Sequence, residues 1–312
     1  MKKVIVLLGP TGVGKTGASI ILAKELKTEI ISADSMQIYR HLDIGTAKPS
    51  EEERAAVRHH MIDIVDPSEA YSAGRYIAEV RPVIERLHQE GRIPVVVGGT
   101  GLYIKAMTRG LFSGPSSDLS LREELLAHEE EQKGSLYEYL REIDPEAAGR
   151  IEQNDIRRII RAIEVCMKSG DTITSFQKEL TRPLPYDFAK IGLTRERKEL
   201  YTMIDERVDI MLKQGLLDEV KKILSMKPDR TPLQAIGYKE IMRFFNQEID
   251  LQEAVRLIKR NSRRYAKRQF TWFRQEEDIH WLDMTGVHDS RSIAGQITAA
   301  LRERLGRHDQ SA

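Results

Sequence analysis

Residues 3–16 read KVIVLLGPTGVGKT, an apolar run followed directly by a glycine-rich loop. The run from Lys3 to Leu8 has the composition of a buried β-strand, and a helical pattern follows the loop from Gly17 to Lys27. The loop satisfies G-x-x-x-x-G-K-T, and its place between a strand and a helix is the context that confirms such a match. Loops of this kind direct backbone N–H groups at phosphate oxygens beside a helix N-terminus. The sequence therefore predicts a binding site for a diphosphate or a triphosphate.

The residues of this loop are the predicted diphosphate-binding or nucleotide-binding set. Lys15 supplies positive charge, and the hydroxyl of Thr16 is a ligand for Mg²⁺, which is the cofactor we expect. The remaining residues shape the loop around the phosphates. The complete set is Gly9, Pro10, Thr11, Gly12, Val13, Gly14, Lys15 and Thr16.

Strands and helices alternate over residues 1–112. Glu29 to Ala33 and Pro94 to Val97 read as buried strands, and Ser72 to Glu90 reads as a long helix between them. This alternation is typical of an α/β fold with a parallel sheet flanked by helices, as in P-loop NTPases. A length of 312 residues is about twice that of a usual domain, so we expect a second domain or a large insertion.

The insertion is predicted at residues 113–184. It opens with SGPSS at 113–117 and closes with RPLP at 182–185, and helical patterns fill the stretch between these loop signals. We therefore expect an inserted all-helical domain at 113–184, and a P-loop catalytic core made of residues 1–112 and 185–312. Tyr186 to Leu193 reads as a further strand of that core, and Leu251 to Trp272 as a long helix.

Composition excludes membrane and fibrous proteins. Hydrophobic residues make up 40% of the chain and charged residues 31%, as in an ordinary globular protein. The apolar run from Val4 to Leu8 is too short for a membrane span or a secretory leader, so we expect no membrane association. A single cysteine, Cys166, agrees with a cytoplasmic location.

Asp34 directly follows the second predicted strand, at the sheet edge where α/β proteins bind their ligands. Its carboxylate would lie near the bound phosphates and could take a proton from an acceptor, although a helix N-cap is an alternative interpretation. The strand from Val95 to Val97 ends in Gly98-Gly99-Thr100 and so lacks the carboxylate that holds metal in hydrolytic NTPases. This favours group transfer over ATP hydrolysis.

Positive charge gathers in two segments. No acidic residue occurs from Ala254 to Gln275, and on a helical wheel one side carries Arg256, Arg260, Arg263, Lys267 and Arg274. A stripe of one sign is typical of a polyanion-binding surface, with a solvated helix face as the alternative. In the second segment, Arg157, Arg158 and Arg161 surround a predicted core face that includes Ile159 and Ile160, and ion pairs within the domain would explain these arginines equally well.

Seven motifs together resemble the bacterial tRNA dimethylallyltransferases, also called tRNA isopentenyltransferases or the IPP transferase family. They are GPTGVGKT at 9–16, DSMQIYRHLDIGTAKP at 34–49, HHMIDIVDP at 59–67, GGTGLY at 98–103, DIRRIIRAIEV at 155–165, PLQAIGYKE at 232–240 and RRYAKRQFTWFR at 263–274. The resemblance runs from residue 4 to about residue 283. It implies transfer of a dimethylallyl group from dimethylallyl diphosphate to N6 of the adenosine 3′ to the anticodon in tRNA, with Mg²⁺ and release of pyrophosphate.

The resemblance also implies residue roles. Asp34 is the expected general base, and Lys15, Thr16 and Arg207 would assist the leaving diphosphate. Residues 113–184 would bind the anticodon stem-loop of tRNA, and we expect the enzyme to be a monomer. The predicted tRNA contacts are Asp34, Ser35, Met36, Gln37, Thr100, Arg122, Arg157, Arg158, Ile159, Ile160 and Arg161.

Two other functions use the same features. A nucleoside or nucleotide kinase would bind ATP in the loop and use Asp34 to activate a hydroxyl. A non-enzymatic RNA-binding ATPase module would use the cationic helix without forming a covalent product. From the sequence, binding of ATP to the loop stays open.

Overall fold

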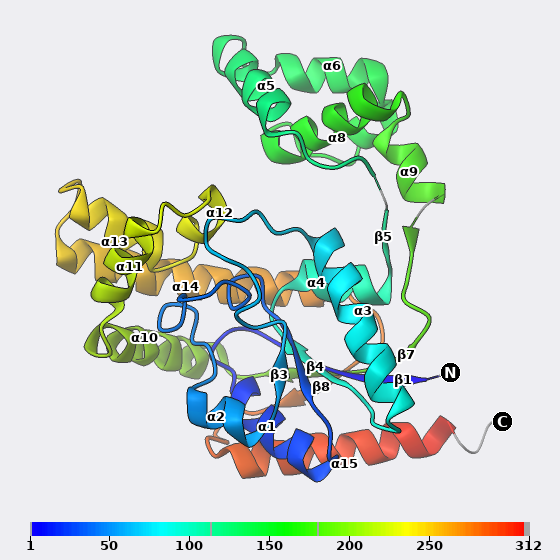
Figure 1. Cartoon of the computed structure of the whole chain (residues 1–312), viewed down its shortest axis with the longest axis vertical. Coiled ribbons are helices and arrows are strands. Elements are labelled where there is room, and N and C mark those ends of the chain that lie inside the picture. The colour runs from blue at the N-terminus through cyan, green and yellow to red at the C-terminus, as the bar shows by residue number, and fades with distance from the viewer. Residues whose placement is uncertain (1, 113, 180, 309–312) are drawn as a thin grey trace. The chain divides into compact units, whose positions relative to one another are not determined.

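A computed structural model describes residues 2–112, 114–179 and 181–308, and the chain forms two compact units (Figure 1). The first unit comprises Met1–Lys105 and Pro185–Ala312, and the second unit comprises Ala106–Leu184. The second unit thus begins before residue 113, the predicted boundary. The two ends of this unit are already joined before residue 113, because the Leu184 N–H donates to the Met107 carbonyl oxygen at 2.9 Å.

The first unit is built on a six-stranded parallel sheet with the order β3-β2-β4-β1-β7-β8. This confirms the predicted α/β class. In the register of the central strands, Leu8 pairs with Gly98 and Gly98 pairs with Ala33. The loops that follow β1, β2 and β4 therefore leave the sheet at one level. The strands are β1 (Lys3–Leu8), β2 (Ile30–Ala33), β3 (His59–His60), β4 (Val95–Gly98), β7 (Asp187–Thr194) and β8 (Ile279–Asp283).

Helices cover both faces of this sheet, and α1 packs beside α15 (Figure 1). The helix α15 has no counterpart in the sequence-based expectations. It is fixed by burial of Ile293 and Ile297 in one core cluster with Leu22 and Ile191. The helices that begin in the first unit are α1 (Lys15–Glu25), α2 (Glu51–Ala56), α3 (Ala73–Gln89), α4 (Gly101–Thr108), α10 (Arg197–Lys213), α11 (Leu216–Ser225), α12 (Arg230–Leu233), α13 (Tyr238–Phe245), α14 (Leu251–Phe273) and α15 (Ser290–His308).

The second unit has its own apolar core, which includes Leu140, Ile159 and Ile163. Its helices are α5 (Leu119–Glu131), α6 (Ser135–Ile143), α7 (Pro145–Ala148), α8 (Ile156–Ser169) and α9 (Ile173–Glu179). The prediction of an all-helical unit is wrong in one respect, because β5 (Leu111–Phe112) and β6 (Thr181–Arg182) form an antiparallel pair. Strands of two residues are too short to show an alternating pattern. Across the described ranges of both units, no helix is long and apolar enough to cross a membrane.

Candidate active site

The phosphate loop joins β1 to α1 with a backbone that glycine favours. Gly14 precedes the first residue of α1 and has a φ of 106°, in the left-handed region that L-residues rarely adopt. Gly9 has a φ of 147°, and a Cβ there would lie 2.6 Å from the Leu193 carbonyl oxygen. The N–H groups in the first turn of α1 have no partner within the helix, so the loop presents donors to an anion.

Lys15 is half-buried within this loop. Its Nζ donates to the carbonyl oxygens of Gly9 at 2.9 Å and Pro10 at 2.8 Å. Burial and the neighbouring Arg207 lower the pKa of Lys15 to about 7, against the opposing effect of Asp34. Both hydrogen-bond partners of Lys15 Nζ are neutral carbonyl oxygens, and a bound diphosphate would give the ammonium an anionic partner.

Asp34 lies at the end of β2, as the sequence predicts, and uses one carboxylate oxygen as a cap. Its Oδ1 accepts from the N–H groups of Met36 at 2.8 Å and Gln37 at 3.3 Å. Residues 35–38 form a turn rather than a helix, so the helix N-cap interpretation is wrong, and Asp34 caps this turn with one oxygen. In the part of the chain that the structure describes, Oδ2 accepts no hydrogen bond, and the residue faces the cavities at the phosphate loop.

Arg207 reaches the same place from α10. Its guanidinium donates to Thr11 Oγ1 at 2.9 Å. Burial lowers the pKa of Arg207, and the charge of Asp34 opposes this shift. The structure thus brings Lys15, Asp34 and Arg207 together, although Arg207 lies far from the other two in the sequence.

Two cavities of the first unit meet at these residues. The first, of about 430 Å³, is lined by the phosphate loop, and the second, of about 250 Å³, has an apolar wall that includes Met211, Leu216 and Ile258. Residues that line both cavities include Thr11, Asp34, Arg207 and Tyr265. An anionic head group and an apolar group can therefore lie side by side next to Asp34.

The other predicted contacts near Asp34 form one connected loop structure. The Ser35 N–H donates to Thr100 Oγ1 at 3.0 Å, and the Thr100 N–H donates to the Ala33 carbonyl oxygen at 3.1 Å. Ser35 and Met36 line the second cavity, while Gln37 lines the first. This arrangement brings the loops after β2 and β4 to one edge of the sheet.

Two residues at the site, Gln269 and Tyr265, are absent from the sequence-based set. Gln269 Oε1 accepts from the Thr11 N–H at 2.8 Å, and its Nε2 donates to the Gly99 carbonyl oxygen at 2.9 Å. Tyr265 precedes it by one helical turn on α14. Burial and Asp34 raise the pKa of Tyr265, and hydrogen bonds with Thr100 and Gln269 oppose them. An uncharged amide within a run of cations, one turn after an aromatic residue, is the signal that could have found this pair.

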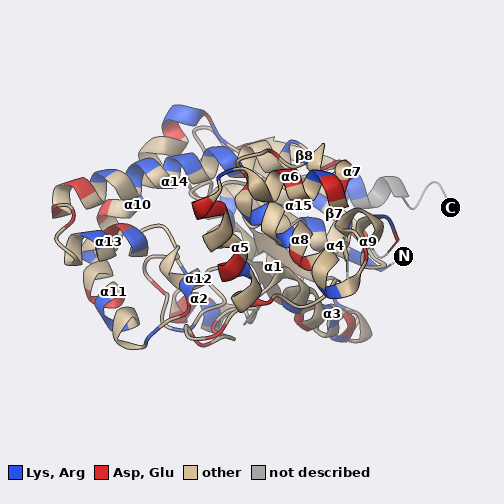
Figure 2. Cartoon of the chain, turned by 90° about the horizontal axis from the view of Figure 1, so that it is seen from above, with Lys and Arg blue, Asp and Glu red and all other residues tan. Residues whose placement is uncertain are grey.

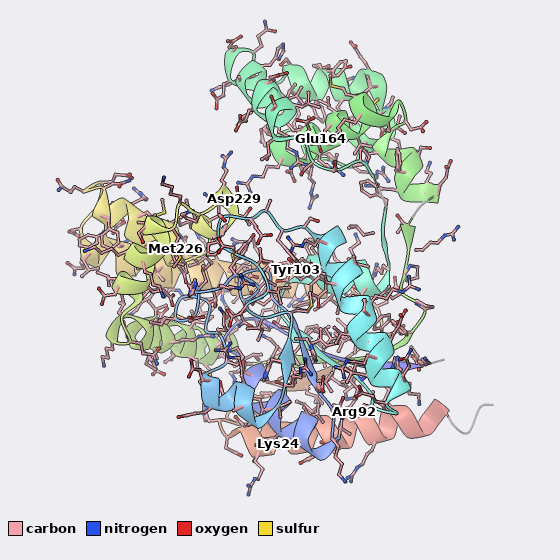
Figure 3. The ribbon with its side chains drawn as sticks, viewed as in Figure 1. Lys24, Arg92, Tyr103, Glu164, Met226 and Asp229 are labelled. Carbon is pink, nitrogen blue, oxygen red and sulfur yellow. The ribbon has the colours of Figure 1, made fainter. Side chains whose placement is uncertain are left out.

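In the second unit, two of the predicted contact arginines form ion pairs with one buried carboxylate. Arg122 donates to both carboxylate oxygens of Glu164, at 2.9 and 2.8 Å, and Arg161 forms a further ion pair with the same group. Glu164 lies among the helices of this unit (Figure 3), and its side chain is fully buried. Burial raises the pKa of Glu164, but hydrogen bonds from Arg122, the Asp118 N–H and Arg161 lower it to about 2. The ion-pair interpretation of the α8 arginines therefore applies to Arg161, and Arg122 pairs with the same carboxylate.

The neighbouring residues on α8 divide between the core and the surface. Arg157 is exposed, and Arg158 is exposed with an ion pair to Asp155 at 3.2 Å. Ile159 and Ile160 lie in the core of the second unit with exposed fractions of 0% and 7%. This confirms the predicted core face, because the helix is amphipathic and both side chains face inward. The tRNA contacts of these residues stay predictions.

Lys and Arg residues recur along α14 (Figure 2), and ion pairs neutralise part of their charge. Lys259 pairs with Asp209 at 2.6 Å, and Arg263 pairs with Asp205, both carboxylates coming from α10. Arg256 pairs with Glu253 on α14 itself. Ion pairs therefore involve two members of the predicted stripe, Arg256 and Arg263, and its role in binding a polyanion stays a prediction. Exposed cations of this helix and its C-cap are Arg256, Arg264, Lys267, Arg268 and Arg274.

Comparison with known proteins agrees with this site. The family model described as IPP transferase matches residues 37–276. A tRNA dimethylallyltransferase of Thermodesulfovibrio yellowstonii is 54% identical over 97% of this chain and 99% of its own length. The chain belongs to the tRNA dimethylallyltransferase family. This confirms the resemblance drawn from the seven motifs and argues against the kinase alternative.

Solved structures of the family share the fold of this chain. The tRNA isopentenylpyrophosphate transferase of Bacillus halodurans is 42% identical, with a TM-score of 0.72, and the match covers 99% of this chain and 100% of that one. A eukaryotic dimethylallyltransferase acting on tRNA is 31% identical, with a TM-score of 0.82, and the match covers 99% of this chain and 80% of that one. The fold is therefore that of the tRNA isopentenyltransferases.

The residues at the phosphate loop fit Mg²⁺. The Thr16 hydroxyl and the Asp34 carboxylate both line the first cavity, so hard oxygen donors are present. Within the described ranges, no group of three or more His, Cys, Asp or Glu side chains could hold a metal ion. Mg²⁺ usually takes one or two protein ligands and completes its shell with phosphate oxygens and water, which agrees with this sparse set.

Proposed function

We propose that this chain transfers a dimethylallyl group from dimethylallyl diphosphate to N6 of the adenosine 3′ to the anticodon in tRNA, and releases pyrophosphate. One observation carries the proposal: Arg207 and the uncapped oxygen of Asp34 lie where two cavities join, and Lys15 of the phosphate loop lines the first of them. Membership of the tRNA dimethylallyltransferase family supports the prenyl donor and the tRNA acceptor.

The donor diphosphate would lie in the first cavity. Lys15 would exchange its two carbonyl partners for phosphate oxygens, and Arg207 would contribute a second cation from α10. These groups are fixed before the reaction, so they stabilise the charge that develops on the leaving pyrophosphate as the allylic C–O bond breaks. When Mg²⁺ is bound through Thr16, it supplies further positive charge to the same oxygens. The apolar wall of the second cavity would contact the five-carbon group.

The acceptor is a poor nucleophile, because the N6 lone pair of adenine is delocalised into the ring. In the proposed step, this pair forms the C–N bond, the C–O electron pair leaves with pyrophosphate, and the N6 proton passes to Asp34 Oδ2. The base must leave the anticodon-loop stack to reach Asp34, as in other enzymes that modify bases.

Contacts to the rest of the tRNA would come from exposed cations. Arg157 and Arg158 of the second unit, with Arg264 and Lys267 of α14, carry charge available to phosphates. We also propose that the enzyme acts as a cytoplasmic monomer and that ATP turnover is negligible.

The test is an incubation of the protein with dimethylallyl diphosphate, Mg²⁺ and unmodified tRNA. Pyrophosphate should appear in step with prenylated adenosine, and tRNA lacking the target adenosine is the control. Rapid RNA-stimulated ATP hydrolysis without a prenyl product would falsify the proposal. Transfer of label from ATP to a small acceptor would instead support the kinase alternative.

A further inference from the structure

Gln269 is a polar residue that α14 buries against two loops of the first unit. Its exposed fraction is 6%, and both atoms of its amide are used. Oε1 accepts from the Thr11 N–H at 2.8 Å, and Nε2 donates to the Gly99 carbonyl oxygen at 2.9 Å. The partners fix the amide orientation, because an N–H can only donate and a carbonyl oxygen can only accept.

The loop after β4 is shaped to receive this helix. A Cβ on Gly99 would lie 2.2 Å from Gln269 Nε2, and a Cβ on Gly101 would lie 2.1 Å from Trp272 Cδ1. Gln269 and Trp272 are three residues apart, so they share one face of α14. Glycine at both positions therefore permits the close approach that brings the amide to the Gly99 carbonyl.

Each of the two bonded loops serves a different side of the proposed reaction. Thr11 belongs to the phosphate loop, and Arg207 holds its hydroxyl at 2.9 Å while Gln269 holds its N–H. Gly99 adjoins Thr100, whose hydroxyl accepts from the Ser35 N–H next to Asp34. One side chain thus connects the loop for the donor diphosphate with the loop that supports the general base.

We infer that Gln269 is a positioning residue that holds the phosphate loop at a fixed spacing from the Thr100 loop, and so aligns the allylic carbon with the attacking N6. The inference rests on the proposed function, because it assigns the two loops to donor and acceptor. Misalignment of reacting groups by about 1 Å can cost about 10²-fold in rate. Loss of the amide should therefore lower the chemical rate more than it weakens donor binding.

The experiment compares Gln269→Met with the wild type and with Gln252→Met, an exposed change in the first turn of the same helix. Single-turnover rates, the KM for dimethylallyl diphosphate and thermal denaturation are measured on each protein. For Gln269→Met we expect a rate lower by about 10- to 100-fold, a KM within about fivefold of the wild type and a folded protein at the assay temperature. Gln252→Met should match the wild type in each measurement.

The Gln269→Glu variant adds a second measurement, the pH dependence of its rate relative to the wild type. A purely structural role of Gln269 would leave this ratio independent of pH. A protonated carboxyl can donate to the Gly99 carbonyl and accept from the Thr11 N–H, whereas a carboxylate can only accept. The ratio of its rate to the wild-type rate should rise as the pH falls from about 8.5 to about 6, because the carboxyl is protonated at low pH. Both rates are measured at saturating dimethylallyl diphosphate, because the new carboxylate shares a cavity with Lys15, Asp34, Arg207 and Tyr265 and changes their titration.

A Gln269→Met enzyme with a single-turnover rate within twofold of the wild type would overturn the inference. A rate loss that only follows the loss of folded protein, with a ratio for Gln269→Glu that does not depend on pH, would also overturn it. If the wild type itself forms no prenylated adenosine, the proposed function fails instead, so the two failures are distinguishable.

Discussion

Replacing Asp34 with asparagine should remove the proton acceptor while it leaves the local fold in place. Asp34 Oδ1 accepts from the N–H groups of Met36 and Gln37, and an asparagine oxygen can accept both bonds. These two hydrogen bonds, worth about 1 kcal/mol each, are therefore kept. Oδ2 is the atom proposed to take the N6 proton. In the asparagine variant an NH₂ group replaces it, and this group cannot accept a proton.

The substitution should have two effects, one on the rate and one on the KM for dimethylallyl diphosphate, with different pH dependence. A lost general base lowers the rate by about 10²- to 10⁴-fold, or about 2.7 to 5.5 kcal/mol. In addition, Asp34 raises the pKa of Lys15, so its removal shifts that pKa below about 7. More Lys15 is then neutral at neutral pH, and the KM for dimethylallyl diphosphate should rise. At about pH 6 that second effect should shrink, while the loss of the general base remains.

The assay is a single-turnover reaction with saturating donor and tRNA, quenched and analysed for prenylated adenosine. Affinity for tRNA, measured separately, should stay within a few-fold of the wild type. Asp34→Ala is the matched control: it should lose the same rate and also unfold at a lower temperature, because it removes the cap. A near-normal single-turnover rate for Asp34→Asn would refute the assignment of the base and leave only a capping or metal-orienting role.

Affinity for dimethylallyl diphosphate without tRNA should be constant below about pH 7 and fall about tenfold per unit above it, since neutral Lys15 must regain a proton to bind. Binding isotherms across this range test the prediction, and Lys15→Arg should remove the dependence. Arg157→Ala should weaken tRNA binding by about 1 kcal/mol without a change in thermal stability. Arg161→Ala should lower the free energy of unfolding by about 1–3 kcal/mol, because the buried Glu164 carboxylate loses a partner, and calorimetry that shows no change would contradict this. Neutralising Arg264 and Lys267 should make the slope of log affinity against log salt shallower by about 1.4, and equal slopes would exclude these two as phosphate contacts.

Short-range patterns in the sequence predict the phosphate loop, the positions of the main strands along the chain and the position of Asp34. In each case the signal lies within about a dozen residues: a strand, a loop of defined spacing and a helix. Asp34 also follows from topology, since parallel strands release their loops at one sheet edge. The residue roles at this site stay predictions.

What the sequence misses depends on contacts between distant elements. Gln269 bonds Thr11 across 258 residues, and Arg263 bonds Asp205 across 58, so no local window contains both partners. The cationic face of α14 is evident from its own residues, but the acids that neutralise it lie on α10. The strands β5 and β6 are missed for another reason, because two residues carry no periodicity.

The most direct test of the central claim is mass spectrometry of tRNA after reaction with the purified protein, dimethylallyl diphosphate and Mg²⁺. The account predicts one added five-carbon isoprene unit on the fragment that contains the adenosine 3′ to the anticodon, with one pyrophosphate released per modified tRNA. Unmodified tRNA after complete binding, or an added group on any other nucleotide, would contradict it.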